Sequence, residues 1–382
     1  MLQVIEFYDK IYLYRFNCGV IFMNRIEMSS DGFSDDQIIE LRKIINGQIK
    51  DARKKSRHDK CLLCDKEGGF CDSHIIPQFC LKNIAWNGKL NSFNTLIDSD
   101  FLKKNSGIKD AGIFHLICRS CDGKVFQNYE NTEAYESVPT ETVLNQIALK
   151  TSLRDIYKHE TELEMYKAMK QVMKEKSPFL SIFINKMFDS QIEARKLDIK
   201  ECYEIFNTAK ENLSSPKKYL KIISYDKLDF TVPIAFQGMI ALVTGVNGET
   251  INDNYNYHSS YKVEYLHIAV FPLKQSTAVI LFLNDKCTRY EKFEKFLSEA
   301  TQEKRLEIIN RIIFLYAEDY YLSKLLDDDI IRELQEPAKI LQDLMTTAPQ
   351  KSLKNAVKDY DLRRDFCIPN LLSRDYSVKF ED

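Results

Sequence analysis

Four cysteines fall into two pairs with the spacing of a metal site. Cys61-Leu-Leu-Cys64 and Cys118-Arg-Ser-Cys121 are both Cys-x-x-Cys motifs. Such a turn directs two thiolates towards one ion, and two turns together supply the four sulfur ligands of a tetrahedral Zn²⁺ site. The alternative is one redox dithiol beside an unrelated pair. Four thiolates leave no position for water, so the spacing predicts a structural zinc and places any catalysis elsewhere.

A histidine motif lies between the two cysteine pairs. The segment Asp72-Ser-His-Ile-Ile-Pro77 precedes the second pair, and Asp122-Gly-Lys124 follows it directly. A histidine with the ordinary pKa of about 6.5 accepts a proton from water at neutral pH. An aspartate supplies the hard oxygen that Mg²⁺ or Mn²⁺ prefers. A histidine at a strand end often has only a structural role, in which its ring makes hydrogen bonds. The position of this histidine between the two cysteine pairs strengthens the prediction that it is catalytic.

In this order of motifs, residues 58–135 resemble the HNH, or His-Me finger, endonucleases in their zinc-framed, treble-clef form. The resemblance implies a β-hairpin and a helix that hold one divalent cation, the ββα-metal arrangement. It implies that His74 is the general base that activates water against a phosphodiester. It also implies that Asp122 binds a catalytic Mg²⁺ or Mn²⁺. Domains of this type recur in restriction and antiphage systems, so a defence role against viruses is part of the expectation.

The chain departs from the family at two positions. Ser73 stands where the family has Asp or Glu, and a neutral hydroxyl is a poor magnesium ligand, although Asp72 is adjacent. The middle Asn of the family is absent, with Ile113 near its place. His115 is then the nearest polar candidate for orienting His74. The predicted catalytic set is therefore His74 and Asp122, with Ser73 and His115 as helpers.

The flanking elements must position this module. Residues 1–57 begin with an apolar, β-prone stretch that predicts one or two strands. Ser34-Asp-Asp-Gln37 is a capping-box pattern that opens a helix, which ends in a basic run between Lys50 and Lys60. This run is either helix-end charge at the negative pole of the helix dipole or a patch that contacts phosphates.

Residues 136–382 predict a larger helical body with β-hairpins, so the fold class expected is α+β. Apolar residues at Val143, Ile147, Leu153 and Ile156 predict a helix, a second is expected from Pro178 and a third from Asp198. A strand is predicted at 219–225, hairpins at 239–252 and 267–283, and helices at 289–300, 303–325 and 328–346. No catalytic motif is visible there, which indicates a recognition or regulatory domain.

The composition is that of an ordinary globular protein. The 382 residues allow two or three domains, with 44% hydrophobic and 29% charged residues. The net charge of −2 excludes a global basic field, so DNA would contact a local patch that includes Arg119, Lys124 and the basic run. The longest apolar stretch, residues 232–246, is too short to cross a bilayer. The charged N-terminus does not resemble a secretory signal, and metal-type cysteine pairs favour a reducing compartment, so a cytoplasmic location is expected.

Three functions remain open at this point. The first is a metal-dependent DNA endonuclease. The second is a non-catalytic zinc module that binds nucleic acid or protein, which Ser73 favours. The third places the function in residues 136–382, as a surface for a protein partner or a second copy of the chain.

Overall fold

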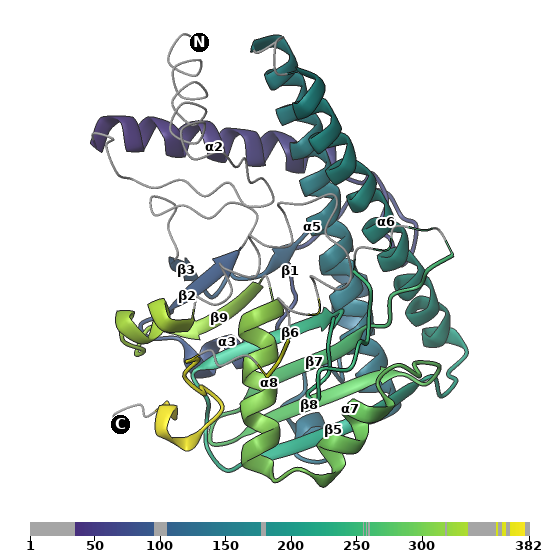
Figure 1. Ribbon diagram of the computed structural model, residues 1–382, viewed down its shortest axis with the longest axis vertical. Coiled ribbons are helices and arrows are strands. Elements are labelled where there is room, and N and C mark those ends of the chain that lie inside the picture. Colours follow the sequence, from purple (N-terminus) through teal and green to yellow (C-terminus); the bar gives the residue numbers. More distant parts are fainter. Residues whose placement is uncertain are drawn as a thin grey trace.

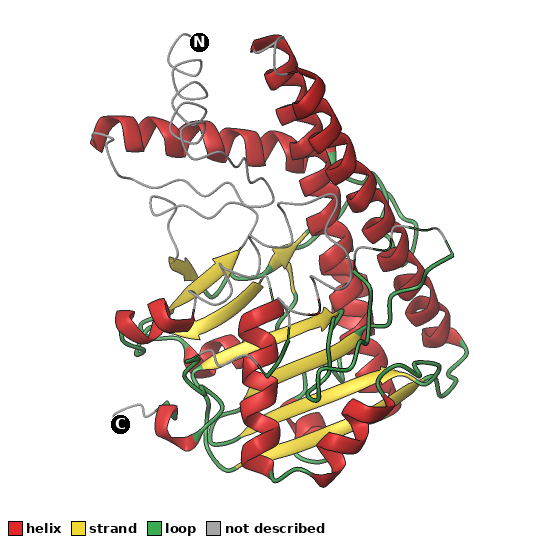
Figure 2. Ribbon diagram, viewed as in Figure 1, coloured by secondary structure: helices red, strands yellow, loops and turns green. Residues whose placement is uncertain are grey.

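The computed structural model describes residues 35–94, 105–176, 181–317 except 255, 257 and 259, then 319–334, 357, 361–363 and 367–378. It is a mixed α/β fold with antiparallel sheets, which agrees with the expected α+β class (Figures 1 and 2). The strands predicted within residues 1–30 lie outside the described residues.

A seven-stranded sheet forms the centre of the fold, and each strand pairs antiparallel with its neighbours. In spatial order the strands are β3 (Asn105–Gly107), β2 (Lys89–Asn94), β9 (Asp319–Ser323), β6 (Ile234–Ile240), β7 (Leu266–Pro272), β8 (Thr277–Asn284) and β5 (Leu220–Leu228).

Both faces of this sheet are buried. In β7, Ile268 and Val270 pack into the core under α7 (Glu291–Glu299) and α8 (Gln302–Tyr316), whereas Ala269 and Phe271 pack into the opposite core. Successive strand side chains point to opposite faces, so a strand between two cores reads as a continuous apolar run. Figure 1 shows α8 crossing one face of the sheet, with α5 on the far side. The predicted 267–283 hairpin is confirmed as β7 and β8.

Two long helices cover the second face and extend beyond it. α5 (Glu141–Lys176) packs along α6 (Ser181–Ser214), and α2 (Asp35–Lys55) contacts α5 (Figure 1). The residues predicted to form the apolar stripe of α5, such as Val143 and Ile147, are buried. The capping-box helix is confirmed as α2.

Three expected boundaries are wrong. No helix begins at Asp198, because α6 runs through it and Asp198 pairs with Arg195 one turn earlier. The helix predicted at 303–325 ends at Tyr316, because the aromatic segment that follows becomes β9 and pairs with β2 and β6. The predicted 239–252 hairpin forms over a shorter range. The Thr244–Thr250 bridge joins its arms, and the Ile251 and Asn252 N–H groups donate to the Val243 and Leu242 carbonyls, whereas the residues up to Ile240 belong to β6, which pairs with β7.

The cysteine-rich region contributes its own small elements. β1 (Ser73–His74) pairs with β4 (Ile113–Phe114) in a two-stranded sheet, and α3 (Gln78–Ile84) follows β1. α4 (Arg119–Val125) starts directly after Cys118. Between these elements, β2 and β3 join the large sheet, so the region is connected to the body by strand pairing as well as by packing.

Candidate metal centre and histidine site

The four cysteines converge on one point. The sulfur atoms of Cys61, Cys64, Cys118 and Cys121 all lie within 4.8 Å of one another. Such proximity suits a tetrahedral Zn²⁺ site, with Zn–S bonds of about 2.3 Å. Among the residues that the structure describes, this is the only group of three or more His, Cys, Asp or Glu side chains close enough to share one ion. The cysteine cluster therefore fits a metal such as zinc.

Backbone hydrogen bonds shape both turns of the cluster. The Leu62 N–H donates to the Leu116 carbonyl at 3.0 Å, which ties the first turn to the second. The Cys118 N–H donates to Cys61 Sγ at 3.3 Å. Hydrogen bonding, first from the backbone of Cys121, lowers the pKa of the Cys118 thiol to about 7. A thiol with this pKa is about half thiolate at pH 7, and the thiolate is the form that binds metal.

His74 has both ring nitrogens engaged. Its Nε2 lies 3.2 Å from the Ile108 carbonyl, an acceptor, so Nε2 carries the proton and Nδ1 presents a lone pair. The Gln78 amide nitrogen lies 3.4 Å from Nδ1, at the long limit for a hydrogen bond. Burial lowers the pKa of His74 below 6.5. The ring is therefore neutral at pH 7, with one basic nitrogen in a fixed orientation.

Asp122 is held by two donors on one oxygen. The Ser73 hydroxyl donates to Asp122 Oδ1 at 2.7 Å, and the Lys150 ammonium donates to the same atom at 2.6 Å. Lys150 comes from the buried face of α5 and is only 1% exposed. Its Nζ also lies 4.0 Å from the ring centroid of Phe126. Ser73 and Asp122, predicted as members of one site, are thus in direct contact, and an unpredicted lysine completes the group.

The Asp122 group does not fit a Mg²⁺ or Mn²⁺ ion in this arrangement. One carboxylate oxygen already binds an ammonium group, and Ser73 offers a neutral hydroxyl where a hard cation prefers a carboxylate. Lys150 supplies positive charge next to Asp122 at the place where the resemblance expects a divalent ion.

His115 is not among the residues that hydrogen-bond the His74 ring, so it does not orient that ring as predicted. Its Nε2 is 2.7 Å from Asp72 Oδ1; the Asp72 side chain is largely exposed and the His115 side chain is partly buried. The groups that contact the His74 ring are the Ile108 carbonyl and the Gln78 side chain instead.

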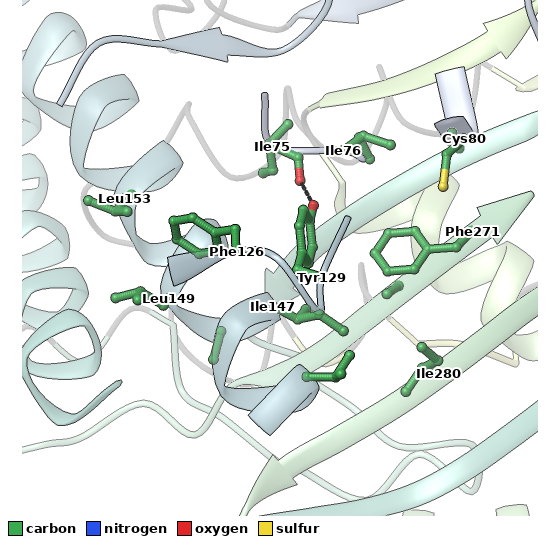
Figure 3. Packing of buried hydrophobic residues seen from close by; sticks show 14 of the residues in the cluster. Ile75, Ile76, Cys80, Phe126, Tyr129, Ile147, Leu149, Leu153, Phe271 and Ile280 are labelled. Atoms are coloured by element: carbon green, nitrogen blue, oxygen red, sulfur yellow. Dashed lines mark hydrogen bonds between the residues drawn. The ribbon is translucent and has the colours of Figure 1, made fainter. Parts of the chain in front are cut away.

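Several residues of the site had no sequence motif to reveal them. Tyr129 donates its hydroxyl to the Ile75 carbonyl, next to His74 (Figure 3). The Tyr129 hydroxyl also lies 2.9 Å from Oε1 of Gln237 in β6. Lys150 did carry a signal, since a lysine three residues after Ile147 lies on the apolar stripe of its helix. Ile108 acts through its backbone carbonyl, which side-chain patterns do not reveal.

No family model matches the chain, and neither a curated protein nor a solved structure shows significant similarity to it. Within the described part of the chain, every helix is too short or too polar to span a bilayer.

Proposed function

We propose that the chain is an HNH-type endonuclease that hydrolyses phosphodiester bonds in DNA, with a structural zinc on Cys61, Cys64, Cys118 and Cys121. The observation that carries the proposal is the state of His74, because its proton is fixed on Nε2 by the Ile108 carbonyl and its lone pair is on Nδ1. The antiparallel pair of β1 and β4, with α4 directly after β4 and Cys118, supports it, since two paired strands and a helix are what the resemblance expects, although α3, β2 and β3 lie between β1 and β4 in the chain.

In the proposed reaction, a water molecule replaces the Gln78 amide at Nδ1 of His74. The imidazole accepts a proton from this water, and the resulting hydroxide attacks the phosphorus of the scissile bond while the P–O bond to the ester oxygen breaks. The leaving alkoxide takes a proton from solvent, and the imidazolium later returns its own proton to solvent. The exposed side chains of Arg119 and Lys124 contact flanking phosphates. The exposed lysines and arginines at the end of α2 extend this contact. A Mg²⁺ or Mn²⁺ ion stays a prediction, and no step above uses it.

The test is plasmid cleavage by wild type and His74→Ala, in parallel with magnesium, with manganese and with EDTA. We expect wild type to nick the plasmid and His74→Ala to lose about 10²- to 10⁴-fold in rate, the usual contribution of a general base. His258→Ala, which removes an exposed loop histidine, is the matched control. Zinc content is measured for all three proteins, because EDTA also competes for the structural ion. Equal nicking by wild type and His74→Ala would refute the mechanism.

The second candidate is a zinc module that binds nucleic acid without cutting it. The pairing of Lys150 with Asp122 favours this function, because it occupies the carboxylate that a catalytic cation would need. It predicts binding that weakens steeply with salt and no products with any metal.

A further inference from the structure

The only tryptophan of the chain lies on the surface. Trp86 is 43% exposed, although tryptophan is usually largely buried in folded proteins. An exposed, rigid aromatic ring is characteristic of sites where another molecule supplies the missing contact.

A tight turn fixes the direction of this side chain. Trp86 and Lys89 exchange both backbone hydrogen bonds, at 3.1 and 3.0 Å. Between them, Asn87 and Gly88 have φ values of 49° and 70°, as a type I′ turn requires. Residues directly opposite each other in an antiparallel pair project from the same face, so Trp86 and Lys89 project together.

Further positive charge lies beside the turn. Leu90 pairs with Ser323, which brings Lys324 close to Lys89, and the charge of Lys89 adds to burial in lowering the pKa of Lys324. Gly107 pairs with Lys89, and the exposed Lys109 follows two residues later. In the described part of the chain, these three lysines form no ion pair. The nearby acids are Asp110, in the same turn as Lys109, and Asp328, which attracts Lys324.

The same surface is connected directly to the histidine site. The Ile108 N–H donates to the Gly88 carbonyl at 3.3 Å, and the Ile108 carbonyl accepts from His74 Nε2 at 3.2 Å. One residue thus bridges the Trp86 turn and the proposed general base.

We propose that Trp86, Lys89, Lys109 and Lys324 form a platform that binds single-stranded nucleic acid, with an unpaired base stacked on the Trp86 ring and its phosphates on the lysines. A base in a duplex is already stacked between its neighbours, so an exposed ring selects unpaired strands, while lysines follow a phosphate backbone of any sequence. The inference rests on the proposed function and specifies its substrate class.

Tryptophan fluorescence reports on this platform directly, because Trp86 is the single tryptophan of the chain. His74→Ala protein, in which cleavage is blocked, is titrated with oligothymidylate while tryptophan emission is recorded. We expect saturable quenching by the single strand and little by a duplex of the same length. Unchanged emission, equal quenching by the duplex, or equal quenching by polyglutamate would overturn the proposal, the last by indicating an acidic peptide as the partner.

The fluorescence anisotropy of a labelled single-stranded oligonucleotide then measures the binding affinity of each variant. Trp86→Ala is expected to bind about tenfold more weakly, and Trp86→Phe to retain most of the affinity. Lys89→Gln and Lys109→Gln are each expected to reduce the slope of log K against log salt by about 0.7. Lys295→Gln, which changes an exposed lysine of α7, should alter neither the affinity nor the salt slope.

Unchanged affinity in Trp86→Ala would refute stacking. Quenching without cleavage of the single strand by wild type would keep the platform and remove the nuclease, and cleavage of the single strand without quenching would do the reverse.

Discussion

At the scale of single residues, the contact between Lys150 and Asp122 determines what the proposed site is able to bind. The ammonium group is buried among aromatic rings, whereas the carboxylate is 29% exposed and also bonded to Ser73. Removing either partner therefore has unequal consequences. A lysine charge left in the interior without its partner is far more costly than a carboxylate that water reaches.

We expect Asp122→Asn to lower the free energy of unfolding by about 3–5 kcal/mol, because it leaves Lys150 charged and buried. Lys150→Met should cost only about 1–3 kcal/mol, since Asp122 keeps the Ser73 hydroxyl and partial hydration. The double variant should be more stable than Asp122→Asn alone. Urea unfolding of the three proteins checks this order, and equal costs for the two single variants would show that the pair is not coupled as described.

The sequence assigned Ser73 and Asp122 to one site, but it did not predict the hydrogen bond between them. The Cys-x-x-Cys spacing predicts the convergence of the four cysteines, because each turn is local and only one long-range step joins the two pairs. Lys150 comes from a helix outside the motif, and the Ile108 carbonyl is backbone. The apolar stripe of α5 predicts that Lys150 is buried, but only tertiary packing brings Lys150 to Asp122 and the Ile108 carbonyl to His74.

At the scale of elements, the periodicity of apolar residues predicted helices with one buried face and strands that are buried on both faces. The apolar runs of β7 and β8 and the stripe of α5 were found because their patterns match one environment along the whole element. β9 was missed since Tyr320, Tyr321 and Leu322 continue the helical pattern of α8. Only the gap between β2 and β6 makes the extended conformation favourable.

One buried strand carries a titratable group. His267 of β7 stacks on Phe282 of β8, its cross-strand partner, at 4.6 Å between ring centroids, and its Nδ1 has no hydrogen-bond partner. Burial lowers the pKa of His267 to about 4. The unfolded chain takes up this proton near pH 6.5 and the folded chain only near pH 4, so His267 destabilises the fold as the pH falls through this window.

The variant His267→Phe removes this proton uptake and keeps an aromatic ring against Phe282. We expect its stability advantage over wild type to grow by about 3 kcal/mol between pH 7 and pH 4. Denaturant unfolding at several pH values measures the difference, which cancels the titration of all other groups. A pH-independent difference would mean that the folded His267 accepts a proton as readily as the unfolded one.

At the scale of the whole molecule, the cysteine-rich region and the body share one interior. Phe126 and Tyr129 pack in the same core as Ile147 of α5 and Phe271 of β7 (Figure 3), and Phe114 belongs to that core as well. The division at residue 136, predicted from a change in sequence pattern, stays a prediction about units of function. Packing is continuous across it, because α5 and the sheet bury the apolar side chains of the region.

We therefore expect a fragment of residues 1–135 not to fold on its own, since it exposes these aromatic side chains and leaves β2 without β9. Circular dichroism and amide dispersion in NMR spectra, recorded with zinc present, test the expectation against the full chain as control. A fragment with native-like dispersion would show that the region is an independent domain.

The pairing of β2 with β9 also determines when the site can form during synthesis of the chain. Asn91 and Ser323, which are joined across these strands, are 232 residues apart in the chain. At about 5–20 residues per second, a ribosome needs roughly 10 to 50 seconds between making one strand and making the other. The Trp86 turn, which supports Ile108 over His74, gains its sheet partner only at the end of this interval. An incomplete nascent chain therefore lacks the finished site, and the proposed nuclease matures only once most of its chain has been synthesised.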